Sequence, residues 1–438
     1  MLGINKILNK VNLIKNKNFL NINYSLDGII IFALLISVIF THLFYFKFTK
    51  YYFQFSELLF LIGCVYLLKN IKIYRKYQLN KIDFTFIFLS LILILNFIFH
   101  PKQEVAIQVV STLYLISFYF LFSIFLKSVP PTTLIKILSE TSYFILWILI
   151  FIGLLGLPLY YFFGIDKFVL VYKNYPYFGD VLRIRGFNYS PNLYISIIAF
   201  FLCLARFFNR ITYIQILLIG IIALLTLTKE AALLMGLLII FSFDKLIDLK
   251  FYLKKLILFV FCFIYLFFSL FFISFNNSPS ILTNKLLLSE SPIFKISNFE
   301  VYTTTYFELL KSGLILFKEN FYFGVGISQF QIQLYHLIDR GLYQNYFDLY
   351  RPHDSYFGIA SELGVLYLFF IFFMFMIIFF MFKKNKDKVL HPIVLLSLYF
   401  MSESVCIGSF HFRHYYIFFA ILPVLLSFHE NTNFKNQN

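Results

Sequence analysis

Charged residues are scarce in this chain of 438 residues: Asp, Glu, Lys and Arg together make up 13% of it. Soluble domains carry about 25%. Tryptophan occurs once and proline 11 times. The shortage of charge excludes a soluble multidomain enzyme and a disordered chain, because neither keeps so few charged residues among so many apolar ones.

Cysteine is also rare, and its placement excludes two further classes. Each of the four cysteines lies inside an apolar run, without CxxC or Cys/His spacing. We therefore infer neither a disulfide scaffold nor a zinc site. We expect all four to be small buried apolar side chains. They are Cys64, Cys203, Cys262 and Cys406.

Apolar and aromatic residues dominate instead, at 61% and 22% of the chain, and the mean hydropathy is +0.82. A helix that spans a bilayer needs about 20 mostly apolar residues. Twelve runs approach that length, which predicts an all-α polytopic membrane protein with about twelve transmembrane helices. The runs are 28–46, 53–68, 82–99, 105–126, 142–163, 191–206, 211–227, 230–243, 256–275, 357–382, 390–409 and 414–428.

The positive charges indicate how these spans are oriented. If the twelve spans alternate, 22 of the 37 Lys and Arg residues fall on the side that holds both termini. Cytoplasmic loops carry this excess, so both termini are expected in the cytoplasm. The net charge of +16 is then largely a topology signal. The predicted partner is the lipid bilayer, and no nucleic acid partner is expected.

Two loops on the predicted outer side are longer than hairpins, at 164–190 and 276–356. A long loop in a compact protein usually serves function. The predicted organisation is therefore nine helices in 1–275, with the shorter outer loop among them, a large helical extracytoplasmic loop at 276–356, and three helices with a cytoplasmic tail in 357–438.

Arginine is concentrated on the outer side, against the positive-inside trend. The planar arginine fork binds phosphate oxygens with two hydrogen bonds, whereas lysine acts as a point charge. Outer arginines at the membrane surface suit a lipid-linked phosphate or pyrophosphate, although each could instead pair with a nearby aspartate or reach lipid headgroups. The outer arginines are Arg183, Arg185, Arg340, Arg351 and Arg413.

The segment 181–196 carries the first candidate site. Arg183 and Arg185 are two residues apart, so in extended backbone both guanidinium groups could share one face. Asn188 and Asn192 follow near the start of the sixth span, where the positive end of a helix favours an anion. The asparagines could bind a sugar or phosphate, or simply cap and solvate the turn.

Two charged residues, Lys229 and Glu230, interrupt an otherwise apolar hairpin between the seventh and eighth spans. Charged residues at the membrane edge are candidates for function because they are costly in lipid. The alternative is that this pair only marks a water-exposed turn.

The large loop ends in the segment 351–370, which carries the second candidate site. Asp354 or Ser355 can cap a helix that runs into the tenth span, so His353 is expected at its outer end, with Arg351 beside it. Glu362 lies two turns further on. A histidine can act as acid or base near neutral pH, so His353 is the predicted catalytic residue. A solvated surface histidine is the alternative.

The other histidines are weaker candidates for a functional site. His411, Arg413 and His414 are expected to form a solvated outer turn between the last two spans. No HExxH motif, nucleophile elbow or metal-ligand spacing occurs on the outer side. We therefore expect no metal and no cofactor.

Four segments together resemble the bacterial O-antigen ligase and O-antigen polymerase superfamily. The most specific is the last, where His353 and Asp354 precede Glu-Leu-Gly at the top of a span. The resemblance departs from the family pattern at Lys229 and Glu230, where the family usually has Arg and Gly. The segments are RIRGFNYSPN (183–192), TLTKEAALL (226–234), FYFGVGISQF (321–330) and RPHDSYFGIASELGVLYLF (351–369).

The resemblance implies the helical architecture of polyprenyl-phosphosugar glycosyltransferases, at the outer face of the bacterial inner membrane. It implies a metal-independent, inverting transfer of an oligosaccharide from undecaprenyl pyrophosphate to a sugar hydroxyl. His353 would act on the acceptor hydroxyl or on the leaving phosphate. The residues expected to bind the pyrophosphate are Arg183, Arg185, Lys229 and Arg351, supported by Asn188, Asn192, Asp354 and Glu362.

The acceptor defines the remaining alternatives. A polymerase, slightly favoured, adds the glycan to another lipid-linked unit, whereas a ligase moves it to a lipid A core or a protein. A polysaccharide chain-length regulator is a further expected partner. Outside this family, a flippase for the same lipid-linked sugar or a non-catalytic envelope partner would also fit a chain of twelve spans.

Overall fold

The computed structural model describes residues 25–40, 45–48, 51–70, 77–175, 179–247, 250–275, 292–343, 352–384, 390–408 and 411–434. Helices account for most of these residues, and each of the twelve apolar runs overlaps one of them. The helices are α2 (Leu26–Ser37), α3 (Phe55–Lys69), α5 (Lys81–Phe99), α6 (Gln103–Ser128), α7 (Pro131–Phe163), α8 (Pro191–Phe207), α9 (Tyr213–Thr226), α10 (Glu230–Ile247), α11 (Phe251–Leu270), α13 (Thr305–Glu319), α14 (Phe330–Asp339), α15 (Phe357–Leu363), α16 (Val365–Lys384), α17 (His391–Glu403) and α18 (Arg413–Phe434), with a 3-10 turn at Val38–Phe40.

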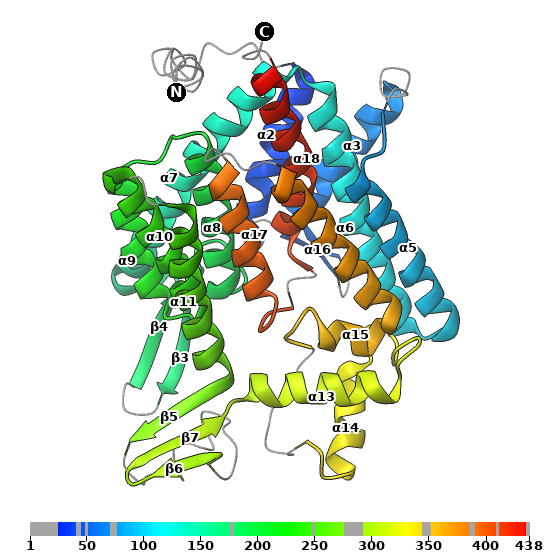
Figure 1. Ribbon diagram of the computed structural model, residues 1–438, viewed down its shortest axis with the longest axis vertical. Coiled ribbons are helices and arrows are strands. Elements are labelled where there is room, and N and C mark those ends of the chain that lie inside the picture. Colours follow the sequence, from blue (N-terminus) through cyan, green and yellow to red (C-terminus); the bar gives the residue numbers. More distant parts are fainter. Residues whose placement is uncertain are drawn as a thin grey trace.

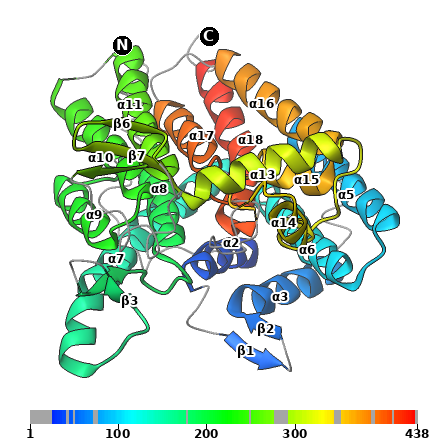
Figure 2. The same ribbon diagram turned by 90° about the horizontal axis from the view of Figure 1, so that it is seen from below.

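The described strands form three small antiparallel sheets, which the expectation of an all-α chain did not include. Two are hairpins, β1 with β2 and β3 with β4, and the third has the order β5-β7-β6. Helices still define the fold, because the sheets lie at the edges of the bundle (Figures 1 and 2). The strands are β1 (Tyr45–Phe48), β2 (Tyr51–Gln54), β3 (Val169–Tyr175), β4 (Gly179–Ile184), β5 (Phe271–Phe275), β6 (Phe294–Ile296) and β7 (Phe299–Thr303).

The helices stand roughly side by side, and the loop elements gather at one end of the bundle. In Figure 1 this is the lower end, where β3 to β7 and α13 to α15 lie. Figure 2 shows α13 crossing this end, from the side of α11 to the side of α15 and α5. Helix α8 is buried along almost its whole length, so it forms the centre of the packing.

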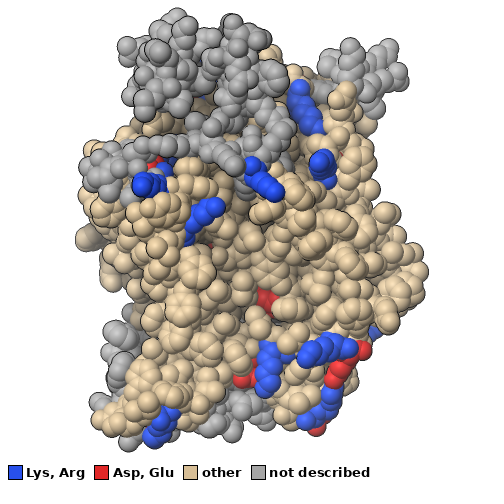
Figure 3. Space-filling view, viewed as in Figure 1, with Lys and Arg blue, Asp and Glu red and all other residues tan. Residues whose placement is uncertain are grey.

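Four of the described helices, α5, α6, α7 and α11, are long and apolar enough to cross a membrane. Several others are apolar but shorter. On the face in Figure 3, blue and red residues lie mainly near the two ends, and a broad band between them is almost free of charge. The expectation of a helical, membrane-associated protein is therefore supported.

Some predicted boundaries are wrong. The run 28–46 stops being helical at Phe40, and 256–275 stops at Leu270, because the residues that follow pair as strands. Helix α7 starts eleven residues before the predicted run, at Pro131, whose ring favours the first helical position. The run 357–382 is broken at Gly364, where φ is +77°.

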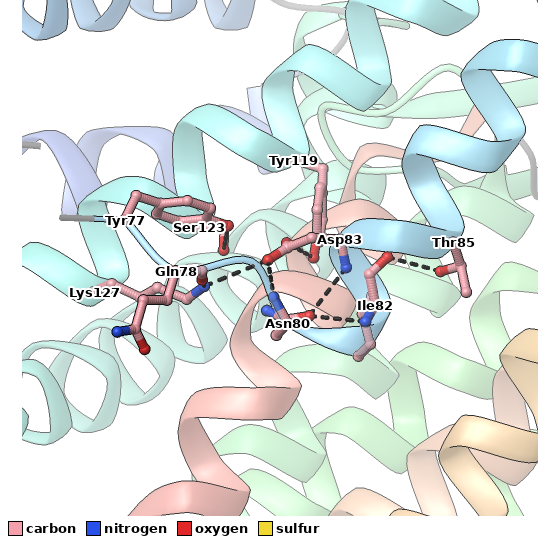
Figure 4. Close-up of polar contacts among 9 residues, drawn as sticks. All are labelled: Tyr77, Gln78, Asn80, Ile82, Asp83, Thr85, Tyr119, Ser123 and Lys127. Carbon is pink, nitrogen blue, oxygen red and sulfur yellow. Dashed lines mark hydrogen bonds and ion pairs between the residues drawn. The ribbon is translucent and has the colours of Figure 1, made fainter. Parts of the chain in front are cut away.

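A polar cluster at the opposite end of α5 from α13 and α15 fixes that helix against α6 (Figure 4). The Asn80 side chain accepts hydrogen bonds from the backbone N–H groups of Ile82 and Asp83, at 2.8 and 3.0 Å. The buried Asp83 carboxylate accepts from the Tyr119 hydroxyl at 2.6 Å and lies 3.4 Å from the Lys127 ammonium. A capping box joined to an ion pair thereby anchors α5.

Candidate functional site

A cavity of about 300 Å³ opens at the end of the bundle where the loop elements gather. It brings together the end of the large loop, the start of α8 and the turn before α18. Among the residues that line it are Gln108, Ser190, Asn192, His353, Glu362 and His411. Three of the predicted site residues, Asn192, His353 and Glu362, thus share one cavity although they lie up to 170 positions apart.

Arg183 lies at the end of β4, next to this cavity. Its Nε donates to the Thr226 carbonyl at 2.9 Å, and its Nη2 lies 3.4 Å from Asn192 Oδ1. The first bond ties β4 to the end of α9, and the second reaches a residue that lines the cavity. Arg183 therefore joins two of the segments that the sequence analysis selected.

Lys229 follows α9 directly and points toward the large loop. Its ammonium donates to the Ser269 carbonyl at 3.2 Å and lies 4.3 Å from the centre of the Tyr306 ring. Burial lowers the pKa of Lys229, and the neighbouring Glu230 opposes this effect. A cation over an aromatic face is stabilised by the ring. Lys229 is thus a half-buried cation and not a solvated turn residue.

His353 packs against the same tyrosine. The His353 and Tyr306 ring centres are 5.2 Å apart, in an edge-to-face arrangement. Burial, and to a smaller extent the positive charge of Lys229, lowers the pKa of His353 to about 4. The imidazole is therefore neutral at pH 7. A neutral imidazole can accept a proton through one nitrogen and donate a hydrogen bond through the other.

Asp354 holds the turn that carries His353. Its carboxylate accepts hydrogen bonds from the backbone N–H groups of Tyr356, at 3.1 Å, and Gly358, at 2.8 Å. Burial raises the pKa of Asp354 to about 6, while these backbone donors act in the opposite direction. The predicted capping role matches this geometry. Gly358 is required there, because an added Cβ would lie 2.6 Å from the Asp354 carboxylate.

Glu362 binds the second half of the large loop. One carboxylate oxygen accepts from the Phe330 backbone N–H at 3.1 Å, at the start of α14. The Glu362 carbonyl accepts from Gly326 N–H at 3.0 Å, and the Ser361 carbonyl accepts from Val325 N–H at 2.8 Å. The Gly-Val-Gly turn and the Glu-Leu-Gly segment therefore pack directly against each other.

Glycine is necessary on both sides of this contact. Gly324 has φ +69°, and a Cβ there would clash with the backbone carbonyl of Glu362. Gly364 has φ +77°, and a Cβ there would clash with the carbonyl of Tyr322. The two glycine motifs are thus explained by close approach of two backbones, which other residues do not permit.

Asn96, near the C-terminal end of α5, completes this arrangement, and sequence reasoning missed it. Its amide donates to the carbonyls of Phe323 and Glu362, at 3.0 and 2.9 Å, and its carbonyl accepts from Ile327 N–H at 2.9 Å. A lone asparagine in an apolar run was the available signal, since such a residue must find partners in a membrane interior. Tyr306 was also missed, because nothing in its local sequence marks it.

Other predicted residues are placed differently. Arg185 is half-buried, and its guanidinium donates to the carbonyls of Lys167 and Asp166, at 3.3 and 3.4 Å. Asn188 is buried, and its N–H donates to the Arg185 carbonyl at 3.1 Å. Neither lines the cavity. Arg351 lies outside the described residues.

The expectation of a solvated turn before α18 is wrong for two of its three residues. His411 does line the cavity and is exposed. Arg413, however, forms a 2.8 Å ion pair with Glu57 of α3, and His414 is fully buried. A charged or polar residue at the start of a buried helix needs a partner from a neighbouring helix, and the local sequence could not show those partners.

Within the described residues, no group of three or more His, Cys, Asp and Glu side chains is arranged to hold a metal ion. All four cysteines are free, with Cys203 and Cys406 buried and the other two half-buried. A scan against models of protein families finds no match for this chain, and a search of curated proteins finds none.

Proposed function

We propose that this protein is a polytopic membrane glycosyltransferase of the O-antigen polymerase and ligase type. It moves an oligosaccharide from undecaprenyl pyrophosphate to a sugar hydroxyl at the outer face of the bacterial inner membrane. About twelve helices cross the membrane in this proposal, with both termini in the cytoplasm. The end with the cavity faces outward.

One observation carries the proposal: a neutral histidine, His353, faces a cavity beside two cations. Lys229 is close enough to lower the pKa of His353. Arg183 lowers the pKa of Lys229 and contacts the cavity residue Asn192. A site that combines a neutral base with neighbouring cations suits the attack of a hydroxyl on a donor with an anionic leaving group.

In the proposed chemical step, the histidine and the two cations have different roles. The acceptor hydroxyl oxygen attacks the anomeric carbon, and the bond from that carbon to the pyrophosphate oxygen breaks, which inverts the configuration. The hydroxyl proton passes to His353 or to the leaving pyrophosphate. The negative charge that grows on the pyrophosphate is stabilised by Lys229 and Arg183 through charge-assisted interactions. No metal enters this scheme.

Two outer arginines have weaker support for a role in this step. Arg185 does not line the cavity and its guanidinium bonds backbone carbonyls, so it would bind pyrophosphate only at the rim of the site. Arg351 precedes His353 by two positions and remains a proposed ligand from its place in the sequence. Polymerase activity stays slightly favoured over ligase activity, and the acceptor distinguishes them.

The test uses purified protein in detergent with an undecaprenyl-pyrophosphate oligosaccharide that carries the native repeat unit. No nucleotide sugar and no metal are added, and lipid-linked glycans are resolved on a gel. A ladder of longer lipid-linked glycans means polymerase. Transfer that requires a lipid A core or a protein acceptor means ligase. No turnover with any acceptor contradicts the proposal and favours a flippase or a non-catalytic envelope partner.

A further inference from the structure

Three side chains from separate helices meet inside the bundle, close to the cavity but not part of it. The hydroxyl of Ser196, from α8, donates to Glu403 Oε2, at the end of α17, at 2.7 Å. The same hydroxyl lies 2.7 Å from His414 Nε2, at the start of α18. All three residues have 0% exposed surface. We call this group the buried polar cluster.

Two tyrosines extend the hydrogen bonds of Glu403. The Tyr415 hydroxyl donates to Glu403 Oε2 at 2.7 Å, and the Tyr265 hydroxyl donates to the Glu403 backbone carbonyl at 3.2 Å. Buried polar groups are expensive unless they are hydrogen-bonded to one another, so such a cluster specifies one arrangement of its helices. Here it fixes the outer ends of α8, α17 and α18, with α11 joined through Tyr265.

The residues that follow Glu403 hold the turn that carries His353. The Ser404 carbonyl accepts from Ser355 N–H at 2.8 Å, and the Ile407 carbonyl accepts from the Ser355 hydroxyl at 3.0 Å. The Tyr356 hydroxyl donates to the Met401 carbonyl at 2.7 Å. The His353 turn is therefore bound to 401–407 by three hydrogen bonds, on both sides of Glu403.

We propose that Glu403, with Ser196 and His414, is a positioning residue for His353. The cluster fixes the end of α17, the segment 404–408 follows from it, and that segment sets where the imidazole lies in the cavity. Ile407 and Gly408 also line the cavity, so a shift of this segment would change both the wall and the histidine. The catalytic part of this inference depends on the proposed glycan transfer.

The test compares Glu403→Ala with Glu403→Gln in the full-length protein. Glutamine keeps an oxygen that can accept from Ser196 and Tyr415, whereas alanine removes it. Glu140→Ala is the control, because it too removes a carboxylate, a half-buried one that pairs with Arg210 at 2.6 Å and takes no part in the cluster. Ser196→Ala is a milder variant that loses a single hydroxyl, for use if Glu403→Ala does not accumulate.

Two readouts are needed. The first is the kcat and KM of glycan transfer, with the native lipid-linked oligosaccharide. We expect Glu403→Ala to lower kcat by about 100-fold, as for a catalytic group displaced by about 1 Å, with little change in KM. Glu403→Gln should restore most of the loss. The second is the rate at which diethyl pyrocarbonate modifies His353, relative to the exposed His411, measured by mass spectrometry.

We expect His353 to react faster in Glu403→Ala than in the parent protein, Glu403→Gln or Glu140→Ala. If Glu403→Ala, or Ser196→Ala in its place, leaves both kcat and the modification rate unchanged, the positioning role is wrong. If the parent protein transfers no glycan, the proposed function fails, and the modification rates still decide whether the cluster positions His353.

Discussion

The ammonium group of Lys229 lies 4.3 Å from the centre of the Tyr306 ring. The His353 ring packs against that same tyrosine, with ring centres 5.2 Å apart. The cation and the imidazole thus contact one aromatic side chain and act on each other electrostatically. This arrangement joins two segments that are more than 120 positions apart in the sequence, and it underlies the first two predictions.

Replacing His353 with alanine should abolish glycan transfer while the protein still folds. The loss of an acid–base group typically lowers the rate by about 100- to 10,000-fold. The ring is half-buried and caps no helix, so the yield and thermal midpoint should change little. His336→Ala in α14 is the control, since His336 does not line the cavity. Equal activity of both variants in the gel assay would contradict the role of His353.

Replacing Lys229 with glutamine should shift the pH dependence of transfer. The charge of Lys229 disfavours protonation of His353, so its removal raises the pKa of His353 from about 4 toward its ordinary value. The acidic limb of the kcat/KM profile, which reports the free enzyme, should move to higher pH. Lys229→Arg keeps the charge and should leave the limb in place. An unmoved limb in Lys229→Gln would show that the two groups are not coupled.

The same depressed pKa predicts how stability depends on pH. His353 is neutral when folded down to about pH 4 but would bind a proton near pH 6.5 when unfolded. Its contribution to the free energy of unfolding is therefore present above pH 6.5 and is lost as the pH falls toward 4. Thermal midpoints measured between pH 7 and 4 should fall less in His353→Gln than in the parent protein.

Alanine variants at Gly324 and Gly341 would distinguish the cost of a positive φ from the cost of a steric clash. Both have positive φ, of +69° and +68°, so alanine at either costs about 1–2 kcal/mol. Only at Gly324 would the new Cβ meet the backbone of Glu362, whereas nothing lies within 4 Å at Gly341. Gly324→Ala should lower the thermal midpoint well beyond Gly341→Ala and should also reduce transfer. Equal midpoints would mean that the two backbones do not approach closely.

Asn96→Ala should destabilise the end of the bundle that holds the cavity. It removes three hydrogen bonds, each of which contributes about 1 kcal/mol, so a loss of about 3 kcal/mol is expected. Ser90→Ala in the same helix is the control, because the Ser90 hydroxyl donates only to the Phe86 carbonyl one turn before it. Thermal unfolding and transfer assays on both variants test this prediction. Similar thermal midpoints would contradict the inference that Asn96 joins α5 to the Gly-Val-Gly turn and the Glu-Leu-Gly segment.

Arg185→Lys tests whether the Arg185 guanidinium binds phosphate through two hydrogen bonds at once. Lysine keeps the charge but loses the paired donors, so transfer should fall if Arg185 binds pyrophosphate with two hydrogen bonds. Because its guanidinium makes only two long hydrogen bonds to backbone carbonyls, of 3.3 and 3.4 Å, folding should change little. Full activity in Arg185→Lys would refute the fork at this position. Arg183→Lys is the companion variant, and it would also remove the hydrogen bond from Arg183 Nε to the Thr226 carbonyl.

The sequence predicts the helical elements well, because long apolar runs leave few alternatives to a helix. It predicts their ends poorly where tertiary pairing decides, as at Phe271–Phe275, where an apolar run leaves the helix and pairs as β5 with β7. His353, Asp354 and Glu362 could be selected because their motif is local. Asn96, Tyr306 and Glu403 could not, since their roles depend on partners from distant helices.

The contact between the Gly-Val-Gly turn and the Glu-Leu-Gly segment has a consequence for biogenesis. Asn96, in the third predicted span, hydrogen-bonds to carbonyl groups that follow it in the chain by 227 and 266 positions. The buried polar cluster needs α18, almost at the end of the polypeptide. A nascent chain that has been synthesised only as far as α11 therefore holds Arg183, Arg185 and Lys229 but no assembled cavity. Synthesis of the last three helices would be the event that completes the site, so a prematurely terminated chain would be inert.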